Sequence, residues 1–376
     1  MDLWNISAID IHAHFLSASD TASDDFSIAL ERTAFASEHP AQRLYDQRSL
    51  RDVGALLGCE PTTEAIATQC NNYGAEEVTR ICFEAANLEA IFLDHGHHKS
   101  DRSEQSFSPT LPQKHIQSHQ LICLESLAEH LISKVDRFDV FLEWFRSELD
   151  PLPQGCAGFQ SIAATRSGLD IHLVYPHVAE ECFYHLKHQQ DETRRHPSLP
   201  KELIDFLLLI AFEVAARYRI PLQFQAGFSG TRADLRLANP LHLRPILEES
   251  QYSEAPIVIL CGAYPYTQEA GILSALYQQV YVSLSTIVPG LSMAGITNVL
   301  GQLLECAPIS KILYSSGGQA RPELLYLGAK WGRMALEKTL EETIRNGDLT
   351  IQEAEKGAIA ILNSNARRLY SLPTDD

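Results

Sequence analysis

The chain alternates between short apolar segments and longer segments of helical spacing, and this alternation limits the fold more than any other feature. Segments such as 200–218 and 291–306 carry apolar residues at helical intervals. Repeated strand-then-helix units predict parallel strands joined by right-handed crossovers. The segments with strand character are 7–13, 90–94, 158–164, 221–225, 257–261, 279–284 and 311–315.

The alternation leaves two architectures open, a closed barrel and an open doubly wound sheet. No GxGxxG or Walker loop follows any of the predicted strands, although nucleotide-binding open sheets carry such loops. At 376 residues the chain has the length of a single α/β barrel with insertions. We therefore expect one α/β domain over residues 1–376, folded as a TIM (β/α)8-type barrel.

Two segments are too long for an ordinary barrel repeat. Residues 25–87 have the pattern of several helices interrupted by Pro and Gly, which predicts a helical insertion after the first strand. Residues 95–120 are polar and contain two prolines, so we expect a loop over the mouth of the barrel. Residues 121–149 have helical spacing, and further helices are expected from 321 to 370.

Two histidines end the first predicted strand. His12 and His14 are two positions apart, so in a strand their side chains point to the same side. Two imidazoles that converge at a strand end suit a divalent metal. The HxH pattern alone fits two ordinary surface or core histidines equally well, and its place on the first strand favours the metal or ligand interpretation.

Several motifs, in order along the chain, resemble those of a known family. They are Asp10-Ile-His12-Ala-His14-Phe15, Gly158-Phe-Gln160-Ser-Ile-Ala-Ala-Thr-Arg166, Pro221-Leu-Gln-Phe-Gln225, Leu235-Arg-Leu-Ala-Asn239-Pro-Leu-His242, Tyr264-Pro-Tyr266 and Tyr314-Ser-Ser316-Gly317. The family is the amidohydrolase-related (amidohydrolase 2) group of predicted metal-dependent TIM-barrel hydrolases, in the branch that includes barrels fused to glutamine-synthetase-like domains. The similar stretches run from residue 8 to about 335.

The resemblance implies a metal held by the two first-strand histidines, a lysine, two later histidines and a final-strand aspartate. Only His12 and His14 match this pattern. Glutamine is a poor zinc ligand and glycine offers no side chain, so we expect no tightly bound metal and no other cofactor. The residues at the other four positions are Gln160, Gln225, Gly262 and Gly317.

Two features could compensate for the missing ligands. Asp10 is expected on the face of His12, one strand step deeper, and is the better candidate. The run Asp94-His95-Gly-His97-His98 follows the second strand, where barrel loops face the mouth. A weakly bound divalent metal therefore stays open as an alternative, against a solvated His-rich loop.

Other side chains predicted at the mouth suit a small ligand. Arginine binds carboxylates in a bidentate manner, and tyrosine offers a hydroxyl on a flat apolar ring. Contacts that merely brace the loops are the competing interpretation for each. The Ser315-Ser316-Gly317-Gly318 turn is not a GxSxG motif and has no evident acid–base partner. The predicted substrate-binding residues are Gln160, Arg166, Gln225, Asp234, Arg236, Tyr264, Tyr266 and Glu269.

Composition excludes some classes of partner. The formal net charge is −18, and no Lys/Arg cluster offers a local exception, so nucleic acid is not an expected partner. No apolar run reaches the length of a membrane span, and the first residues lack a secretory pattern. Scattered cysteines without a CxxC pair suit a reducing compartment. We expect a cytoplasmic protein with a small-molecule ligand, and a homo-oligomer is left open.

Three functions follow from these residues. The first is a divergent enzyme that works without the usual metal, with His12 or His14 as acid–base on a carboxylate- or amide-bearing metabolite, by hydrolase or lyase chemistry. The second is a non-catalytic barrel that binds a small molecule or serves as a partner subunit. The third is a metal-dependent hydrolase with substituted ligands. The sequence favours the first over the second by a small margin.

Overall fold

The centre of the molecule is one parallel sheet of eight strands in the order β1 to β8. A computed structural model describes residues 1–14, 43–94, 116–193, 198–228, 234–285, 290–318 and 321–373. Each strand pairs in parallel with the next one along the chain. The strands are β1 Ala8–His14, β2 Leu88–Asp94, β3 Gln117–Cys123, β4 Cys156–Ser161, β5 Leu222–Phe224, β6 Ile257–Ile259, β7 Val280–Ser285 and β8 Ile312–Ser315.

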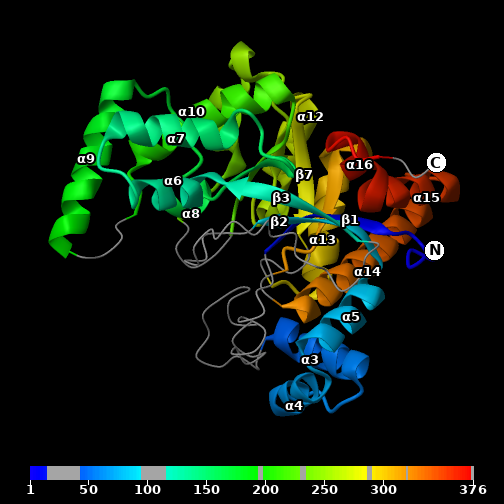
Figure 1. Ribbon diagram of the computed structural model, residues 1–376. Coiled ribbons are helices and arrows are strands. Elements are labelled where there is room, and N and C mark those ends of the chain that lie inside the picture. The colour runs from blue at the N-terminus through cyan, green and yellow to red at the C-terminus, as the bar shows by residue number, and fades with distance from the viewer. Residues whose placement is uncertain are drawn as a thin grey trace.

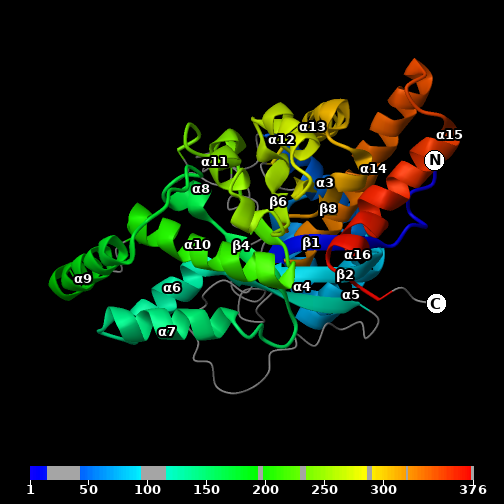
Figure 2. The same cartoon turned by 90° about the horizontal axis from the view of Figure 1, so that it is seen from above.

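The sheet curves into a nearly closed barrel. Gly317 N donates to His12 O at 3.1 Å, and His14 N donates to Gly318 O at 2.9 Å. These backbone bonds join β1 to the segment after β8. Figure 1 shows the strands in the middle and the helices around them, and Figure 2 shows the same arrangement from above. The expected α/β barrel is confirmed.

The helices after β3 and β4 lie on one side of the barrel, and the C-terminal helices lie on the opposite side together with both chain ends (Figures 1 and 2). No helix in the described ranges is long and apolar enough to cross a membrane. The longer helices after β3 are α6 Leu124–Ile132, α7 Phe138–Leu149, α9 Pro176–Thr193, α10 Lys201–Tyr218, α12 Thr267–Leu276, α13 Met293–Cys306, α14 Pro322–Asn346 and α15 Ile351–Ile359. Short helical segments are α8 Ala163–Arg166, η2 Pro240–Leu243, α11 Arg244–Leu247, η3 Ser250–Tyr252, η4 Cys261–Ala263, η5 Ile309–Lys311, η6 Ala360–Ser364 and α16 Asn365–Leu369.

The described residues between β1 and β2 contain three helices, namely α3 Leu44–Leu57, α4 Thr63–Tyr73 and α5 Ala75–Ala86. α5 packs against α14, and α3 and α4 extend beyond this pair (Figure 1). Thr62 caps α4 by accepting a hydrogen bond from Ala65 N. The part of the expected helical insertion before residue 43 lies outside the described residues.

The strand β3 differs from the prediction. Residues 117–120 were expected to belong to a polar loop and residues from 121 onward to a helix, yet 117–123 form a strand between β2 and β4. The first half of β3 is polar and only partly buried, so it shows neither an apolar run nor a strict alternation. Pairing with two neighbouring strands overrides this weak local pattern. Residues 95–115 of the expected mouth loop lie outside the described residues.

Alternation along the strands divides the core into two layers. Ile9, Ile11 and Phe92 belong to a cluster inside the barrel. Phe159 and Phe224 belong to the larger cluster between the barrel and its helices. Close packing of β4 on β5 requires a glycine at position 158, because a Cβ there would lie 2.5 Å from Pro221 O.

Candidate active site

His12 and His14 lie next to each other at the carboxyl end of β1. Their ring centroids are 5.1 Å apart with an interplanar angle of 84°. The register between β1 and β2 shifts between Asp10 and Ala13, and such an irregularity re-aims the side chains that follow it. His12 is buried, whereas 29% of the His14 side chain is exposed. His14 is thus the more exposed of the two imidazoles.

Gln223 on β5 determines the tautomer of His12. Its Nε2 donates to Ile11 O at 2.8 Å and to the Tyr370 hydroxyl at 2.7 Å. A carbonyl can only accept, so the amide NH₂ group has to face Ile11 and the Oε1 atom faces His12. Because Oε1 lies 3.1 Å from His12 Nδ1, that nitrogen carries the proton and Nε2 carries the lone pair.

His12 is held in its neutral form. Burial, together with the neighbouring His14, lowers the pKa of His12 from 6.5 to about 3, although the bond to Gln223 opposes the change. An imidazole of this pKa does not take up a second proton at neutral pH. His12 therefore presents a hydrogen-bond acceptor rather than an acid or a strong base.

His14 has a carboxylate partner at the end of β2. Its Nδ1 lies 3.5 Å from Asp94 Oδ2, and Asp94 is only 4% exposed. The two residues are paired in register between β1 and β2. A carboxylate on one ring nitrogen orients an imidazole and stabilises its protonated form, which leaves the other nitrogen for proton transfer.

Gln160 on β4 has a buried amide group with no hydrogen-bond partner. The residue is 0% exposed, and neither Oε1 nor Nε2 is bonded. Phe159 packs between the barrel and the helices, and Ser161 Oγ donates to Glu125 of α6 at 2.6 Å. Because both neighbours in the strand point outward, the side chain of Gln160 points into the barrel.

Two buried carboxyl groups accept hydrogen bonds from backbone N–H groups at the carboxyl ends of strands. Asp10 Oδ1 accepts from Ser316 N at 2.9 Å and from His12 N at 3.2 Å, and burial raises its pKa to about 6. Glu125 accepts from Ile162 N at 3.0 Å and burial raises its pKa. Asp10, predicted as a residual metal ligand, is thus engaged with backbone where β1 meets the segment after β8.

The charged residues predicted at the rim are paired with protein groups. Arg166 Nη2 lies 3.2 Å from Glu129 Oε1. Arg236 Nη2 lies 2.6 Å from Asp234 Oδ2, and 88% of the Arg236 side chain is exposed. The Arg236 carbonyl accepts from His242 Nε2 at 2.9 Å. The other predicted ligand residues, all half-buried, are Gln225, Tyr264, Tyr266 and Glu269.

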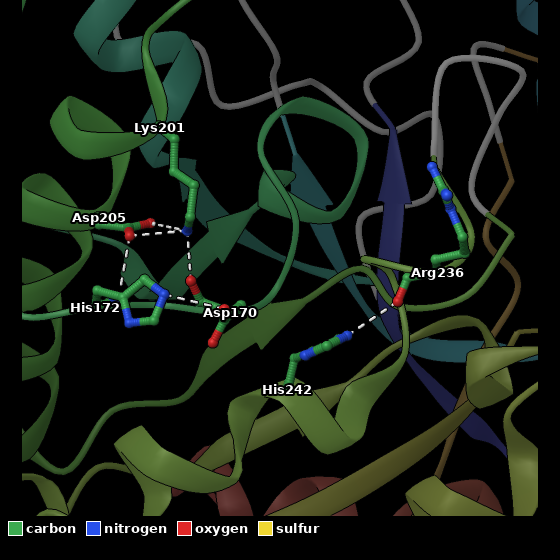
Figure 3. A network of polar contacts seen from close by, with 6 residues as sticks. All are labelled: Asp170, His172, Lys201, Asp205, Arg236 and His242. Atoms are coloured by element: carbon green, nitrogen blue, oxygen red, sulfur yellow. Dashed lines mark hydrogen bonds and ion pairs between the residues drawn. The ribbon is translucent and has the colours of Figure 1, made fainter.

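A second polar cluster braces the segment that follows β4 (Figure 3). Lys201 Nζ, at the start of α10, donates to Asp205 Oδ2 at 2.8 Å and to the Asp170 carbonyl. His172 N donates to Asp205 at 3.1 Å, and His172 Nε2 lies 3.0 Å from Asp170 Oδ2. These contacts tie the loop to α10, so the cluster accounts for loop structure rather than for the site.

The turn after β6 differs from the prediction. β6 ends at Ile259, and Cys261, Gly262 and Ala263 all have positive φ, at 61°, 54° and 50°. A Cβ at position 262 would meet Val299 of α13 at 2.8 Å, so this position faces a helix and not His12. Cys261, the last residue of the predicted strand 257–261, instead follows the end of β6 and joins the cluster inside the barrel. The early end of the strand explains both differences.

The side chains of the described residues do not form a donor set that fits a catalytic metal. Within the described ranges, His, Cys, Asp and Glu side chains form no group of three or more that could hold an ion. Catalytic zinc sites use three protein ligands. His12 Nδ1 is engaged with Gln223, and the inward position on β4 carries the neutral amide of Gln160. The residues His95–His98, proposed as substitute ligands, lie outside the described residues.

Gln223 and Tyr370 were not singled out from the sequence, and Asp94 was named there only as the first residue of the His-rich run. Gln223 lies two positions before Gln225, so alternation along the predicted strand 221–225 is the signal that could have found it. Asp94 ends its strand beside the HxH motif of β1. Tyr370 follows α16 and reaches Gln223 from 147 positions away, which no local pattern indicates.

Comparison with known proteins gives one relative in sequence. No protein-family model matches the chain. The protein FluG of Emericella nidulans is 32% identical over 224 residues, which cover 57% of this chain and 25% of FluG. The match therefore spans about a quarter of the length of that relative.

Solved structures resemble the chain over nearly its whole length. A proposed metal-dependent hydrolase of Lactobacillus casei superposes with a TM-score of 0.85 at 23% identity, covering 99% of this chain and 98% of the other. Uronate isomerase of Thermotoga maritima gives a TM-score of 0.70 at 13% identity, covering 97% and 95%. Uronate isomerase of Bacillus halodurans gives 0.61 at 13% identity, covering 98% and 94%. At these identities the likeness establishes the fold and leaves the activity open.

Proposed function

We propose that the protein is a divergent member of the amidohydrolase superfamily that acts on a small carboxylate- or amide-bearing metabolite without a metal ion. The similarity to a proposed metal-dependent hydrolase over 99% of this chain supports the superfamily. The donor set around His12 and His14 supports metal-independent chemistry, because glutamine occupies the inward position on β4. The reaction class is hydrolysis or a lyase reaction such as decarboxylation.

The contact between His14 and Asp94 carries this proposal. Asp94 faces Nδ1 of His14 at 3.5 Å, so Nε2 of His14 is available to take a proton from water or substrate. The carboxylate then stabilises the imidazolium that forms. His12, which is neutral, accepts a hydrogen bond at Nε2 and orients the ligand. Arg166 anchors an anionic part of the ligand in competition with Glu129.

A turnover screen of small amides, lactones and carboxylic acids tests the proposal. His14→Ala is expected to lower kcat by roughly 10²–10⁴-fold, the usual contribution of a general acid or base. Asp94→Asn should lower kcat less and alter the pH profile, whereas Arg166→Ala should raise KM. His177→Ala, on the exposed surface of α9, is the matched control. Two results would contradict the proposal and support a metal-dependent hydrolase. One is wild-type activity that disappears on chelation, and the other is one tightly held zinc, iron or manganese ion per chain.

A non-catalytic binding protein is the second candidate. The observation that favours it is the buried amide of Gln160, which can bind a ligand but has no acid–base function. Binding of small amides or acids without turnover of any of them, in a wild-type protein of full stability, would establish this alternative over the enzyme.

A further inference from the structure

The side-chain amide of Gln160 has no hydrogen-bond partner within the described part of the protein. The amide has two donor protons and an acceptor oxygen, and all remain unbonded at 0% exposure. Burying an amide without hydrogen bonds is unfavourable by several kcal/mol in an apolar medium. Such a group inside a barrel, at the carboxyl end of its strand, indicates contact with something that is not part of the protein chain.

The neighbours of Gln160 within the sheet do not supply the missing bonds. On β5, Gln223 is in register with Gln160, but both of its amide protons are used by Ile11 and Tyr370. Its Oε1 is used by His12. On β3, the residue in register is Cys123, whose thiol lies 3.9 Å from a carboxyl oxygen of Glu125. The partner of Gln160 therefore has to come from inside the barrel.

We infer that Gln160 recognises a neutral carboxamide or lactam group of the ligand. A carboxamide offers a carbonyl to Nε2 and an N–H to Oε1, so one planar group satisfies both atoms of Gln160. A carboxylate has no proton to donate and would leave Oε1 facing a negative oxygen. This inference rests on the proposed function in that the ligand binds at the carboxyl end of the barrel, and it names the substrate class.

The acceptor atom of His12 supports the choice of a ligand group with N–H donors. A carboxylate has no N–H to offer this atom, whereas a primary carboxamide has two. His12 Nε2, as an acceptor, is complementary to a further N–H of the ligand.

Matched pairs of small molecules test the inference. The probes are propionamide against propionate, benzamide against benzoate, and 2-pyrrolidone, titrated at pH 7.5 into protein labelled with [15N]glutamine. The side-chain NH₂ signals of Gln160 are identified by their absence in Gln160→Met. We expect the amides to shift these signals and to bind at least tenfold more tightly than the carboxylates. Gln160→Met should weaken amide binding at least tenfold, and Gln47→Met, on the exposed face of α3, should not.

The outcomes separate this inference from the proposed function. Equal binding of amides and carboxylates, or amide binding unchanged in Gln160→Met, would overturn the role of Gln160 and leave the His14 chemistry standing. Binding of carboxylates alone would overturn it in the same way. Absence of binding by every probe would overturn the inference, while the turnover screen with His14→Ala decides the proposed function independently. The wild-type comparison holds whether or not Gln160→Met folds.

Discussion

Two buried polar side chains in this molecule have opposite surroundings. Arg333 of α14 is 1% exposed, and all five of its N–H groups donate to backbone carbonyls. Gln160 is 0% exposed, and neither its Nε2 nor its Oε1 makes a hydrogen bond to the described residues. The carbonyls that Arg333 binds belong to Leu3, Ile6, Ala86, Asn87 and Ala329. Arg333 ties distant segments of the chain together, whereas Gln160 is available to bond a ligand inside the barrel.

The largest expected effect of this contrast concerns Arg333. Arg333→Met removes the donor of five carbonyls that tie the first residues and the α5–β2 junction to α14. We expect the free energy of unfolding to fall by about 3–5 kcal/mol, the scale of a broken buried polar network. Urea denaturation measures it, with Arg345→Met on the exposed part of α14 as the control. A loss below about 1 kcal/mol would show that the Arg333 bonds contribute little.

A second contrast is in pH dependence. The folded pKa of His12 is about 3 against 6.5, so the unfolded chain binds the extra proton and stability falls as pH drops below 6.5. The folded pKa of Asp10 is about 6 against 3.8, so the folded protein keeps the proton and stability rises as pH drops from 6 towards 3.8. The two groups oppose each other around pH 5.

His12→Asn removes the destabilisation that His12 causes at low pH, so the stabilisation that Asp10 contributes on acidification should become measurable. Between pH 7.5 and pH 5, the His12 contribution is about 2 kcal/mol, because one pKa unit corresponds to about 1.4 kcal/mol. The variant should therefore gain stability on acidification relative to wild type by about that amount. Denaturation at the two pH values measures it, and His177→Asn on α9 is the control. Parallel curves for wild type and His12→Asn would mean that His12 is not held neutral.

For Gln160 we expect substitution to raise the free energy of unfolding, whereas substitution of Arg333 lowers it. Gln160→Met replaces an unsatisfied amide by an apolar side chain of similar length, so the ligand-free protein should gain about 1–2 kcal/mol. The same replacement at Gln47 should change stability little, because that residue is exposed on α3. Thermal and urea unfolding report the difference. A net loss of stability in Gln160→Met would show that the wild-type amide is bonded in solution, and the contrast with Arg333 would be broken.

The smallest effect is expected at Tyr370. Tyr370→Phe removes one hydrogen bond to Gln223 and leaves the ring on Phe92, so it should cost about 1 kcal/mol. The bond from Gln223 to Ile11 remains, so the 15N shifts of His12 should still report a proton on Nδ1. A variant in which the proton moves to Nε2 would show that Tyr370 also orients the amide.

The sequence predicted the barrel more completely than the site. β1 and β4 have apolar residues and motifs that identify them, whereas β3 is polar in its first half and is stabilised by its two neighbours. His12, His14 and Gln160 follow from alternation and resemblance. The bonding of Gln223 to His12 and the direction of position 262 depend on register and on where a strand ends. Those depend on contacts between distant segments, which no local pattern encodes.

The contact between Tyr370 and Gln223 also bears on the order of events during synthesis. Within the barrel, β1 is synthesised before the other strands, whereas Tyr370 follows all eight of them. Asn363, 356 positions after Ser7, donates to its carbonyl at 3.1 Å. In a nascent chain that lacks this segment, the edge of β1 has no partner there and the side-chain amide of Gln223 lacks its bond to Tyr370. Contacts of such long range slow folding and expose partly formed sheets to aggregation. Closure of this barrel therefore depends on a segment that is made only after all eight strands.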